Sequence, residues 1–218
     1  MDFLIGLFEF ALSRPERVLE GVIQHTGYVA SVLVTAAFLA VVTGILTRKS
    51  QLAKELSLSL ASVFLTIPSL ALFVIFIPFV GLGFAPSFIA LLLYSLLPIL
   101  RNTITGLEGI DAGVLESAKG MGLSSTQVLL KVQLPLAWPV ILAGLRVSSM
   151  LVVGLAALAT LVAGGGLGDF IKDGLARLPL PNSYESIWLG TLLSLVLAVI
   201  IDLILQALRL ATISKGIR

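Results

Sequence analysis

Residues Glu116–Pro135, "ESAKGMGLSSTQVLLKVQLP", form a long polar stretch in the middle of a very apolar chain. It combines glycines, hydroxyl residues, lysines and a glutamate, and apolar segments flank it on both sides. A simple connection between two membrane spans needs only a short turn. The length and composition of this stretch therefore indicate a structured loop with a task of its own.

The composition places the chain in a membrane. It has 218 residues, of which 58% are hydrophobic and only 12% are charged. A soluble domain carries about 25% charged residues, so the sequence predicts an integral membrane protein. Cysteine is absent, which excludes disulfides and cysteine-based metal or redox sites. The net charge of +2 gives no reason to expect nucleic acid as a partner.

Apolar segments long enough to cross a bilayer predict an all-α bundle of five spans. A span needs about 20 predominantly apolar residues. The five candidates are approximately Tyr28–Leu46, Leu56–Val80, Pro86–Leu100, Pro139–Val162 and Ile187–Leu208. The second contains Pro68 and Pro78, which we expect to kink it inside the bundle. No internal repeat is visible.

These spans divide the chain into three parts. Residues 1–24, which begin "MDFLIGLFEFALSRPERVLE", lack the basic start of a signal peptide and are typical of a short amphipathic helix at the interface. Residues 25–210 form the membrane domain, with the polar loop at about residues 108–135. Residues 211–218 form a tail. No soluble domain is expected.

The charges beside the spans predict the orientation. With five spans, one face of the membrane holds four cations and the other holds ten. The ten are Arg48, Lys49, Lys54, Arg101, Lys119, Lys131, Arg146, Arg209, Lys215 and Arg218. Because Lys and Arg accumulate on the cytoplasmic side, the loop at residues 108–135 and the tail are expected in the cytoplasm.

The polar loop has the signals of two short helices joined by a glycine turn. Asp111 is a plausible N-cap for a helix through about Lys119. Gly120 and Gly122 can end that helix, because glycine adopts positive φ without steric cost. Ser124 or Ser125 can cap a second helix, which we expect to carry Val128, Leu129 and Val132 and to end near Pro135. Such a unit suits docking into a soluble partner, and the alternative is an amphipathic loop resting on lipid headgroups.

The spacing within this loop resembles the "EAA…G…LP" loop of permease subunits of bacterial ABC importers. Glu116-Ser117-Ala118 is followed by Gly122 and by Leu134-Pro135, with Ser117 standing where the family usually has alanine. In that family the loop forms the coupling helices that sit in a groove of the ATPase. The resemblance assigns ATPase coupling to Glu116, Ser117, Ala118, Lys119, Gly120, Gly122, Leu134 and Pro135.

Three longer stretches extend the resemblance. Thr66–Asp111, Leu134–Arg146 and Leu161–Leu175 are similar to permeases that import osmoprotectants, the quaternary amines glycine betaine, choline and carnitine. Permeases for methionine or another small amino-acid-like solute share the loop and the five-span plan, and remain the alternative. The resemblance implies a MetI-like fold in the bacterial cytoplasmic (inner) membrane.

The same resemblance implies partners that this chain does not contain. Two permease subunits, identical or paralogous, would frame one path. Two ATPases would dock on the cytoplasmic side, and an extracytoplasmic substrate-binding protein would deliver the solute. The chain has no "GxxxxGK[ST]" phosphate loop. We therefore expect no catalytic residue, metal or cofactor here, since ATP and magnesium would be bound by the ATPase.

Two charges lie inside the predicted spans. Arg146 follows Pro139 by seven residues, and Asp202 precedes Arg209 by seven. At 1.5 Å per residue both lie roughly 10 Å from the cytoplasmic face, so they can pair. The alternatives are that Arg146 extends alone to the headgroups, or that it bonds to one of the polar residues Asn102, Glu108 and Asp111. A secondary transporter would need more intramembrane charges or inverted repeats.

The remaining candidates lie near the opposite face. "AGGGLGD", Ala163–Asp169, is expected to be a flexible break after the fourth span, and Gly164, Gly165, Gly166 and Gly168 form a possible gate hinge. His25 is expected as a polar residue at the interface. Trp138, Trp188 and Tyr184 fit an aromatic belt at the span ends or, alternatively, a cation–π cage for a quaternary amine.

Overall fold

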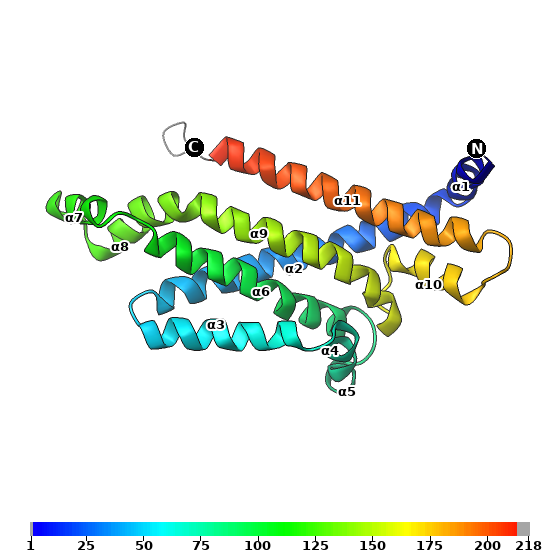
Figure 1. Ribbon diagram of the computed structural model, residues 1–218, viewed down its shortest axis with the longest axis horizontal. Coiled ribbons are helices and arrows are strands. Elements are labelled where there is room, and N and C mark those ends of the chain that lie inside the picture. Colours follow the sequence, from blue (N-terminus) through cyan, green and yellow to red (C-terminus); the bar gives the residue numbers. More distant parts are fainter. Residues whose placement is uncertain (1, 213–218) are drawn as a thin grey trace.

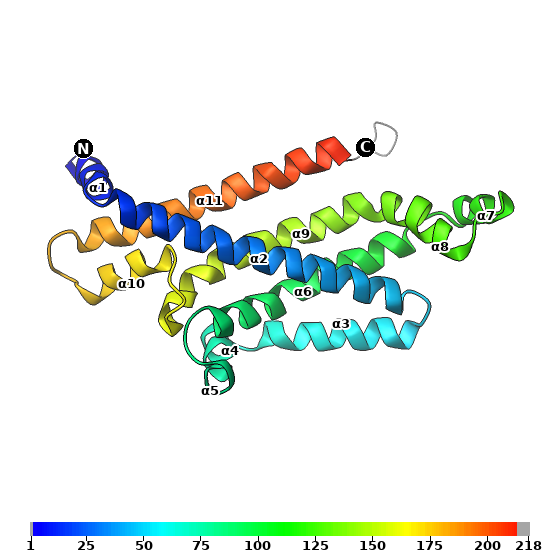
Figure 2. The same cartoon turned by 180° about the vertical axis from the view of Figure 1, so that it is seen from behind.

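The computed structural model describes residues 2–212, which contain helices and turns but no strand. The elongated bundle has α7 and α8 at one end and α1 and α10 at the other (Figures 1 and 2). The helices are α1 (Asp2–Leu12), α2 (Pro15–Thr47), α3 (Gln51–Thr66), α4 (Ser69–Ile75), α5 (Ile77–Val80), α6 (Phe84–Glu108), α7 (Ala112–Gly120), α8 (Ser125–Val128), α9 (Leu134–Ala156), α10 (Gly168–Ala176) and α11 (Ser183–Thr212). A π-helical turn, Leu129–Gln133, precedes α9, and a 3-10 helix, Ala157–Val162, follows it.

Four continuous helices in residues 2–212 are long and apolar enough to cross a membrane. They are α2, α6, the composite helix Ser125–Val162 and α11. A fifth crossing is formed if Gln51–Thr66 and Ser69–Val80 are counted together, although they meet at 102°. The all-α prediction is confirmed, and five spans is the upper count that the structure allows.

The second span is broken, not kinked as the sequence suggested. The helix α3 ends at Thr66 after 16 residues, and Ile67 is extended, with φ −77° and ψ 132°. The residue before a proline is disfavoured in the helical region, so Pro68 stops the helix. The Tyr94 hydroxyl donates a hydrogen bond to the carbonyl of Ile67. This bond satisfies a carbonyl that the break leaves free, which allows a sharp turn inside the bundle.

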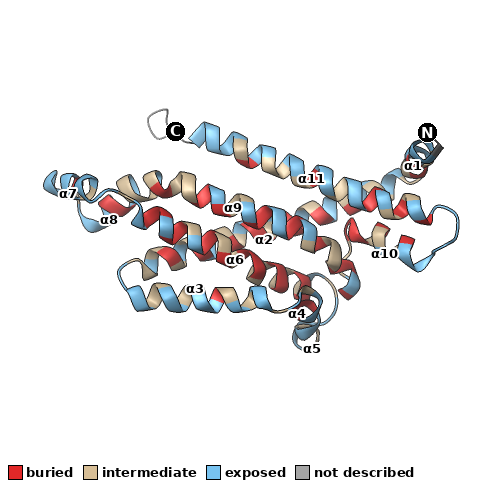
Figure 3. Cartoon of the chain, viewed as in Figure 1, coloured by how far each residue is buried: buried red, intermediate tan, exposed pale blue. Residues whose placement is uncertain are grey.

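The core lies where α6 packs between α2 and α9. In Figure 3 the buried residues concentrate on these three helices, whereas α11 is mostly exposed. Gly144 of α9 lies so close to α6 that an added Cβ would be 2.7 Å from the Pro98 carbonyl oxygen. Gly44 of α2 similarly approaches Thr103 of α6. Membrane helices use such small residues to pack backbone against backbone, because lipid supplies no hydrophobic driving force between them.

The fourth span starts earlier than predicted, because Pro135 does not end the preceding helix. Ser125–Val162 is one composite helix. In its π-helical turn the Leu134 N–H donates to the Leu129 carbonyl, five residues back. Pro135, which has no N–H to donate, follows directly after this turn, where the bonding pattern changes from π-helical to α-helical. The coupling loop is thus continuous with a membrane span.

The first helix of the chain packs against the last. The helix α1 packs against α11 through a small cluster that includes Leu7, Phe10 and Leu189. The Phe3 and Trp188 rings meet edge to face at 6.2 Å. Of the predicted tail, residues 211–218, the part from 213 onward lies outside the described residues, and α11 runs to Thr212.

Candidate functional site

The first helix of the coupling loop (residues 108–135) is fixed by its N-cap. The Asp111 carboxylate accepts hydrogen bonds from the backbone N–H groups of Gly113 at 2.8 Å and Val114 at 3.3 Å. These bonds satisfy two donors that a helix start leaves free. The helix α7 then runs to Gly120, as the cap and the glycines predicted.

The bend after α7 depends on the backbone of Gly122. Its φ is +82°, in the left-handed region. The Gly122 N–H bonds to the Lys119 carbonyl, and the Leu123 N–H bonds to the Ala118 carbonyl. This pair of bonds is the Schellman arrangement, which ends helices most readily at glycine. An added Cβ at Gly122 would meet nothing within 4 Å, so the requirement for glycine is conformational.

The second helix of the loop begins with a reciprocal cap. The Ser124 hydroxyl accepts from the Gln127 N–H at 3.3 Å, and the Gln127 side chain accepts from the Ser124 N–H at 2.8 Å. This is a capping box. Of the two serines that the sequence offered, Ser124 is therefore the cap. Short-range bonds thus hold α7 and α8 together as a compact unit that projects at one end of the bundle (Figure 1).

The coupling candidates divide into an exposed and a buried set. Ala118 is buried against the loop, with 2% of its surface exposed, and Leu134 is half-buried. The other six are exposed, namely Glu116, Ser117, Lys119, Gly120, Gly122 and Pro135. Glu116 has no ion-pair partner among the side chains of residues 3–212. The loop therefore has an exposed face, and the small side chain of Ala118 packs on its inner side.

Arg146 and Asp202 are in contact between α9 and α11. The Arg146 Nε and Nη2 atoms lie 2.7 Å and 2.9 Å from the two carboxylate oxygens of Asp202. Gln206, one turn further along α11, donates to the same carboxylate at 2.6 Å. The two side chains are 29% and 17% exposed. Equal depth in adjacent spans predicted this contact, and bidentate pairing is the strongest geometry for it.

The alternative partners of Arg146 are engaged elsewhere. Asn102 donates to the Pro98 carbonyl, Glu108 pairs with Lys54, and Asp111 caps α7. The pair with Asp202 therefore accounts for both intramembrane charges. It joins α11, which is otherwise mostly exposed, to the inner part of the bundle.

The turn Ala163–Gly168, here called the glycine turn, is held by close packing. Gly165 and Gly166 have φ of +77° and +88°. An added Cβ at Gly168 would be 1.9 Å from the Ala157 carbonyl oxygen, and one at Gly164 would be 2.7 Å from that of Ala159. The turn thus contains glycine both for backbone conformation and for space. The flexible break that the sequence suggested is, in this structure, a closely packed junction.

Contacts from distant parts of the chain complete the glycine turn. The Gln24 side chain accepts from the Gly166 N–H at 3.0 Å. Asp169, directly after the turn, accepts a hydrogen bond from Thr160. Arg17 of α2 pairs with Asp173 of α10. These bonds join α2 to the segment after the fourth span.

His25, expected as a polar residue at the interface, is buried within the protein. Its side chain is fully covered, and its Nε2 donates to the Val153 carbonyl at 3.1 Å. That carbonyl lies where α9 tightens into the 3-10 helix at Ala157, so its usual helical donor is lost. His25 replaces that donor from α2. The sequence around His25 does not predict this bond, because its partner lies 128 residues away on α9.

Among the side chains that the structure describes, no group of three His, Cys, Asp or Glu could hold a metal ion. The aromatic candidates also lie apart. Trp138 donates to Thr212 at the C-terminal end of α11, whereas Trp188 and Tyr184 lie near its beginning. About 36 Å of helix separates Trp188 from Thr212 at 1.5 Å per residue, so Trp138 and Trp188 share no cage within this subunit.

The sequence of this chain is similar to those of known transport proteins. Residues 33–212 match a family model described as "Binding-protein-dependent transport system inner membrane component". The carnitine transport permease protein OpuCB of Listeria monocytogenes is 36% identical over 220 residues, covering 100% of this chain and 97% of that protein. The choline transport system permease protein OpuBB of Bacillus subtilis is 35% identical over 201 residues, covering 91% and 90%.

A third relative and a solved structure agree. The osmoprotectant import permease protein OsmW of Salmonella typhimurium is 34% identical over 200 residues, covering 89% of this chain and 91% of that protein. A chain of the MetNI methionine ABC transporter in an inward-facing conformation superposes with a TM-score of 0.78, covering 92% of this chain and 98% of that one. Its sequence identity is 21%, so this likeness shows the fold alone.

Proposed function

Because the chain belongs to the family of binding-protein-dependent transport system inner membrane components, we propose that it forms the translocation path for a quaternary-amine osmoprotectant such as glycine betaine, choline or carnitine. It is the permease subunit of an ABC importer, a multi-pass protein of the inner membrane. It is not an enzyme, and ATP hydrolysis belongs to its ATPase partner.

The substrate class is supported mainly by one observation. A relative named for carnitine transport is 36% identical and covers essentially the whole of both chains. Relatives named for choline and for osmoprotectant import match almost as much of the chain. The methionine transporter shares the fold at much lower identity, so a quaternary amine is favoured over an amino acid.

The coupling loop is proposed to dock into the ATPase. Its exposed face includes Glu116 and Ser117, and its two helices are fixed by their own caps and by the Gly122 bend. A preformed unit of this kind loses little conformational freedom on docking. Because α8 continues through the π-helical turn into α9, a movement of the ATPase would pass directly into a span.

The Arg146–Asp202 pair and the glycine turn are proposed to act at the two ends of that movement. The ion pair joins α9 to α11, so the two spans would move together when the ATPases close. The glycine turn lies at the far end of the same composite helix. A gate there would open by rearranging packed contacts, since Gly164 and Gly168 leave no room for gradual bending.

The complete transporter is proposed to contain two permease subunits, either two copies of this chain or this chain and a paralogue. The family implies an ATPase and a substrate-binding protein as further partners. We place residues 1–24 at the extracytoplasmic interface, the membrane domain at 25–210 and the tail, 211–218, in the cytoplasm. ATP and magnesium would be held by the ATPase.

A competition experiment tests the substrate class. The complete transporter, in proteoliposomes with its binding protein, is supplied in separate assays with labelled glycine betaine and with labelled methionine. Excess unlabelled carnitine, choline or methionine is added to the glycine betaine assay. We expect uptake that needs ATP, competition by at least one quaternary amine and none by methionine. Uptake of methionine, with no uptake of or competition by any quaternary amine, would overturn the proposed substrate class while leaving the family intact.

A further inference from the structure

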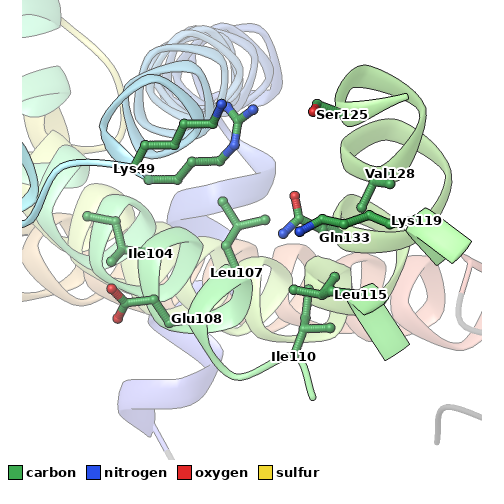
Figure 4. A pocket seen from close by; sticks show the side chains of 11 residues that line it. Lys49, Ile104, Leu107, Glu108, Ile110, Leu115, Lys119, Ser125, Val128 and Gln133 are labelled. Carbon is green, nitrogen blue, oxygen red and sulfur yellow. The ribbon is translucent and has the colours of Figure 1, made fainter. Parts of the chain in front are cut away.

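A cavity of about 420 Å³ lies between the coupling loop and the turn that joins α2 to α3. In Figure 4 the side chains of the α2–α3 turn face those of α7 and α8 across it. Its lining residues are Arg48, Lys49, Ile104, Leu107, Glu108, Ile110, Leu115, Lys119, Ser125, Val128 and Gln133. The volume falls within the range of small-molecule sites, about 300–1,000 Å³.

The rim of this cavity carries positive charge without compensation from the described part of the chain. Arg48, Lys49 and Lys119 form no ion pair with the side chains of residues 3–212. The one acidic lining residue, Glu108, is paired with Lys54. Arg48 donates to the Ile45 carbonyl at 2.7 Å, which uses only part of its guanidinium. Three cations from two separate elements thus face one cavity, and its one acidic side chain is already paired with another lysine.

The floor of the cavity is apolar. Four apolar side chains line it, namely Ile104, Leu107, Leu115 and Val128. Leu107 and Val128 are buried, with 6% and 4% of their surface exposed. A site for a free carboxylate or inorganic ion needs no such surface. A charged rim over an apolar floor matches a molecule that is itself amphipathic.

The rim cations lie at the end of a membrane helix. Only Arg48–Ser50 separates the end of α2, which is long and apolar enough to span, from the start of α3, and α3 then runs back alongside α2 (Figure 2). Basic residues directly after a span attract the anionic lipids of the cytoplasmic leaflet. This position favours a lipid over a soluble anion.

We propose that this cavity binds the headgroup of an anionic phospholipid. Its phosphate would lie among Arg48, Lys49 and Lys119, where charge-assisted hydrogen bonds are strongest. Its glycerol backbone would cover the apolar floor. Because Arg48 and Lys119 belong to opposite walls, the lipid would bridge the α2–α3 turn and the coupling loop. This inference does not depend on which solute is transported.

The test uses the purified permease–ATPase complex, titrated with phosphatidylglycerol or phosphatidylcholine and followed by native mass spectrometry. Wild type is expected to retain phosphatidylglycerol in preference. The double variant Arg48→Gln, Lys49→Gln should weaken this retention about 25-fold, since each cation near the surface contributes about fivefold, or about 1 kcal/mol. Lys119→Gln, on the opposite wall, should weaken it about fivefold.

The matched control removes two exposed cations that do not line the cavity, Arg101→Gln and Lys131→Gln. It should leave retention of phosphatidylglycerol within about twofold of wild type. An equal loss in the control would show general charge attraction and overturn the site. Unchanged lipid retention in Arg48→Gln, Lys49→Gln, with loss of the ATPase from the complex, would instead assign the cavity to an acidic side chain of the ATPase.

Discussion

The two ends of the composite helix Ser125–Val162 are stabilised in different ways. At the coupling loop the bonds are local, since Asp111, Gly122 and Ser124 each contact residues a few positions away. The glycine turn also has long-range bonds, since the Gly166 N–H donates to Gln24 of α2 and the Gly83 N–H donates to the Val162 carbonyl, directly before the turn. The coupling loop makes its stabilising hydrogen bonds within itself and has an exposed face. The glycine turn gains its long-range bonds only when the helices of the bundle have packed together.

This difference separates two kinds of effect. Substitutions at the glycine turn should disturb packing between segments, and should therefore reduce the amount of assembled protein. Substitutions on the coupling loop should leave the bundle intact and change what the exposed face does to a partner. The predictions below go from the largest expected loss of stability to the smallest.

The largest loss is expected for Gly168→Ala. The new Cβ would lie 1.9 Å from the Ala157 carbonyl oxygen, which is backbone and cannot rotate away. Overpacking of this severity should cost about 3 kcal/mol or more. The measurement is the yield and melting temperature of the purified permease–ATPase complex.

The control for that change is Gly154→Ala, in the interior of α9. No atom lies within 4 Å of its added Cβ, and its φ is ordinary, so stability should stay the same or rise by up to about 1 kcal/mol. Equal yields and melting temperatures for the two variants would show that the glycine turn is not the packed junction described here.

A smaller loss is expected when the intramembrane pair is broken. Arg146→Ala and Asp202→Ala should each cost about 2–3 kcal/mol, because the remaining charge is then isolated in the membrane. The exchanged variant Arg146→Asp, Asp202→Arg should recover part of the loss. Assembly and uptake of all four proteins are compared. Additive losses, without recovery on exchange, would contradict a functional pair.

The smallest loss is expected at a cap of the coupling loop. Ser124→Ala removes the hydroxyl that accepts from Gln127 and should destabilise α8 by about 1 kcal/mol. Hydrogen exchange in the loop should increase while the spans remain protected. Ser125→Ala is the matched control, since the Ser125 hydroxyl makes no cap in the described structure. Similar exchange in both variants would contradict the assignment of the cap.

The capped helices of the coupling loop could be predicted from the sequence, whereas the long-range contacts of the glycine turn could not. Asp111, Ser124 and Gly122 act on neighbours within a few residues, so their spacing alone predicted two capped helices. The Arg146–Asp202 contact was also accessible, because depth along a helix follows from a fixed rise per residue.

What the sequence missed depends on partners far along the chain. Pro68 marks a break rather than a kink because Tyr94 of α6 bonds to the carbonyl of Ile67. His25 is buried because Val153 of α9 has a free carbonyl at that depth. The glycine turn gave the signals of flexibility, and only the packing around Gly168 shows why glycine is needed there.

The central claim is that the exposed face and the Gly122 bend of the coupling loop transmit ATP hydrolysis to transport. The most direct measurement compares substrate uptake and substrate-stimulated ATPase activity in proteoliposomes for Gly122→Asp, Glu116→Lys and wild type. Both variants should assemble. Gly122→Asp should strain the left-handed bend, and Glu116→Lys should reverse an exposed charge. We predict that uptake falls at least about tenfold, which corresponds to about 1.4 kcal/mol in the transport step. We also predict that substrate no longer stimulates the ATPase activity. Wild-type uptake and wild-type stimulation in both variants would contradict the account.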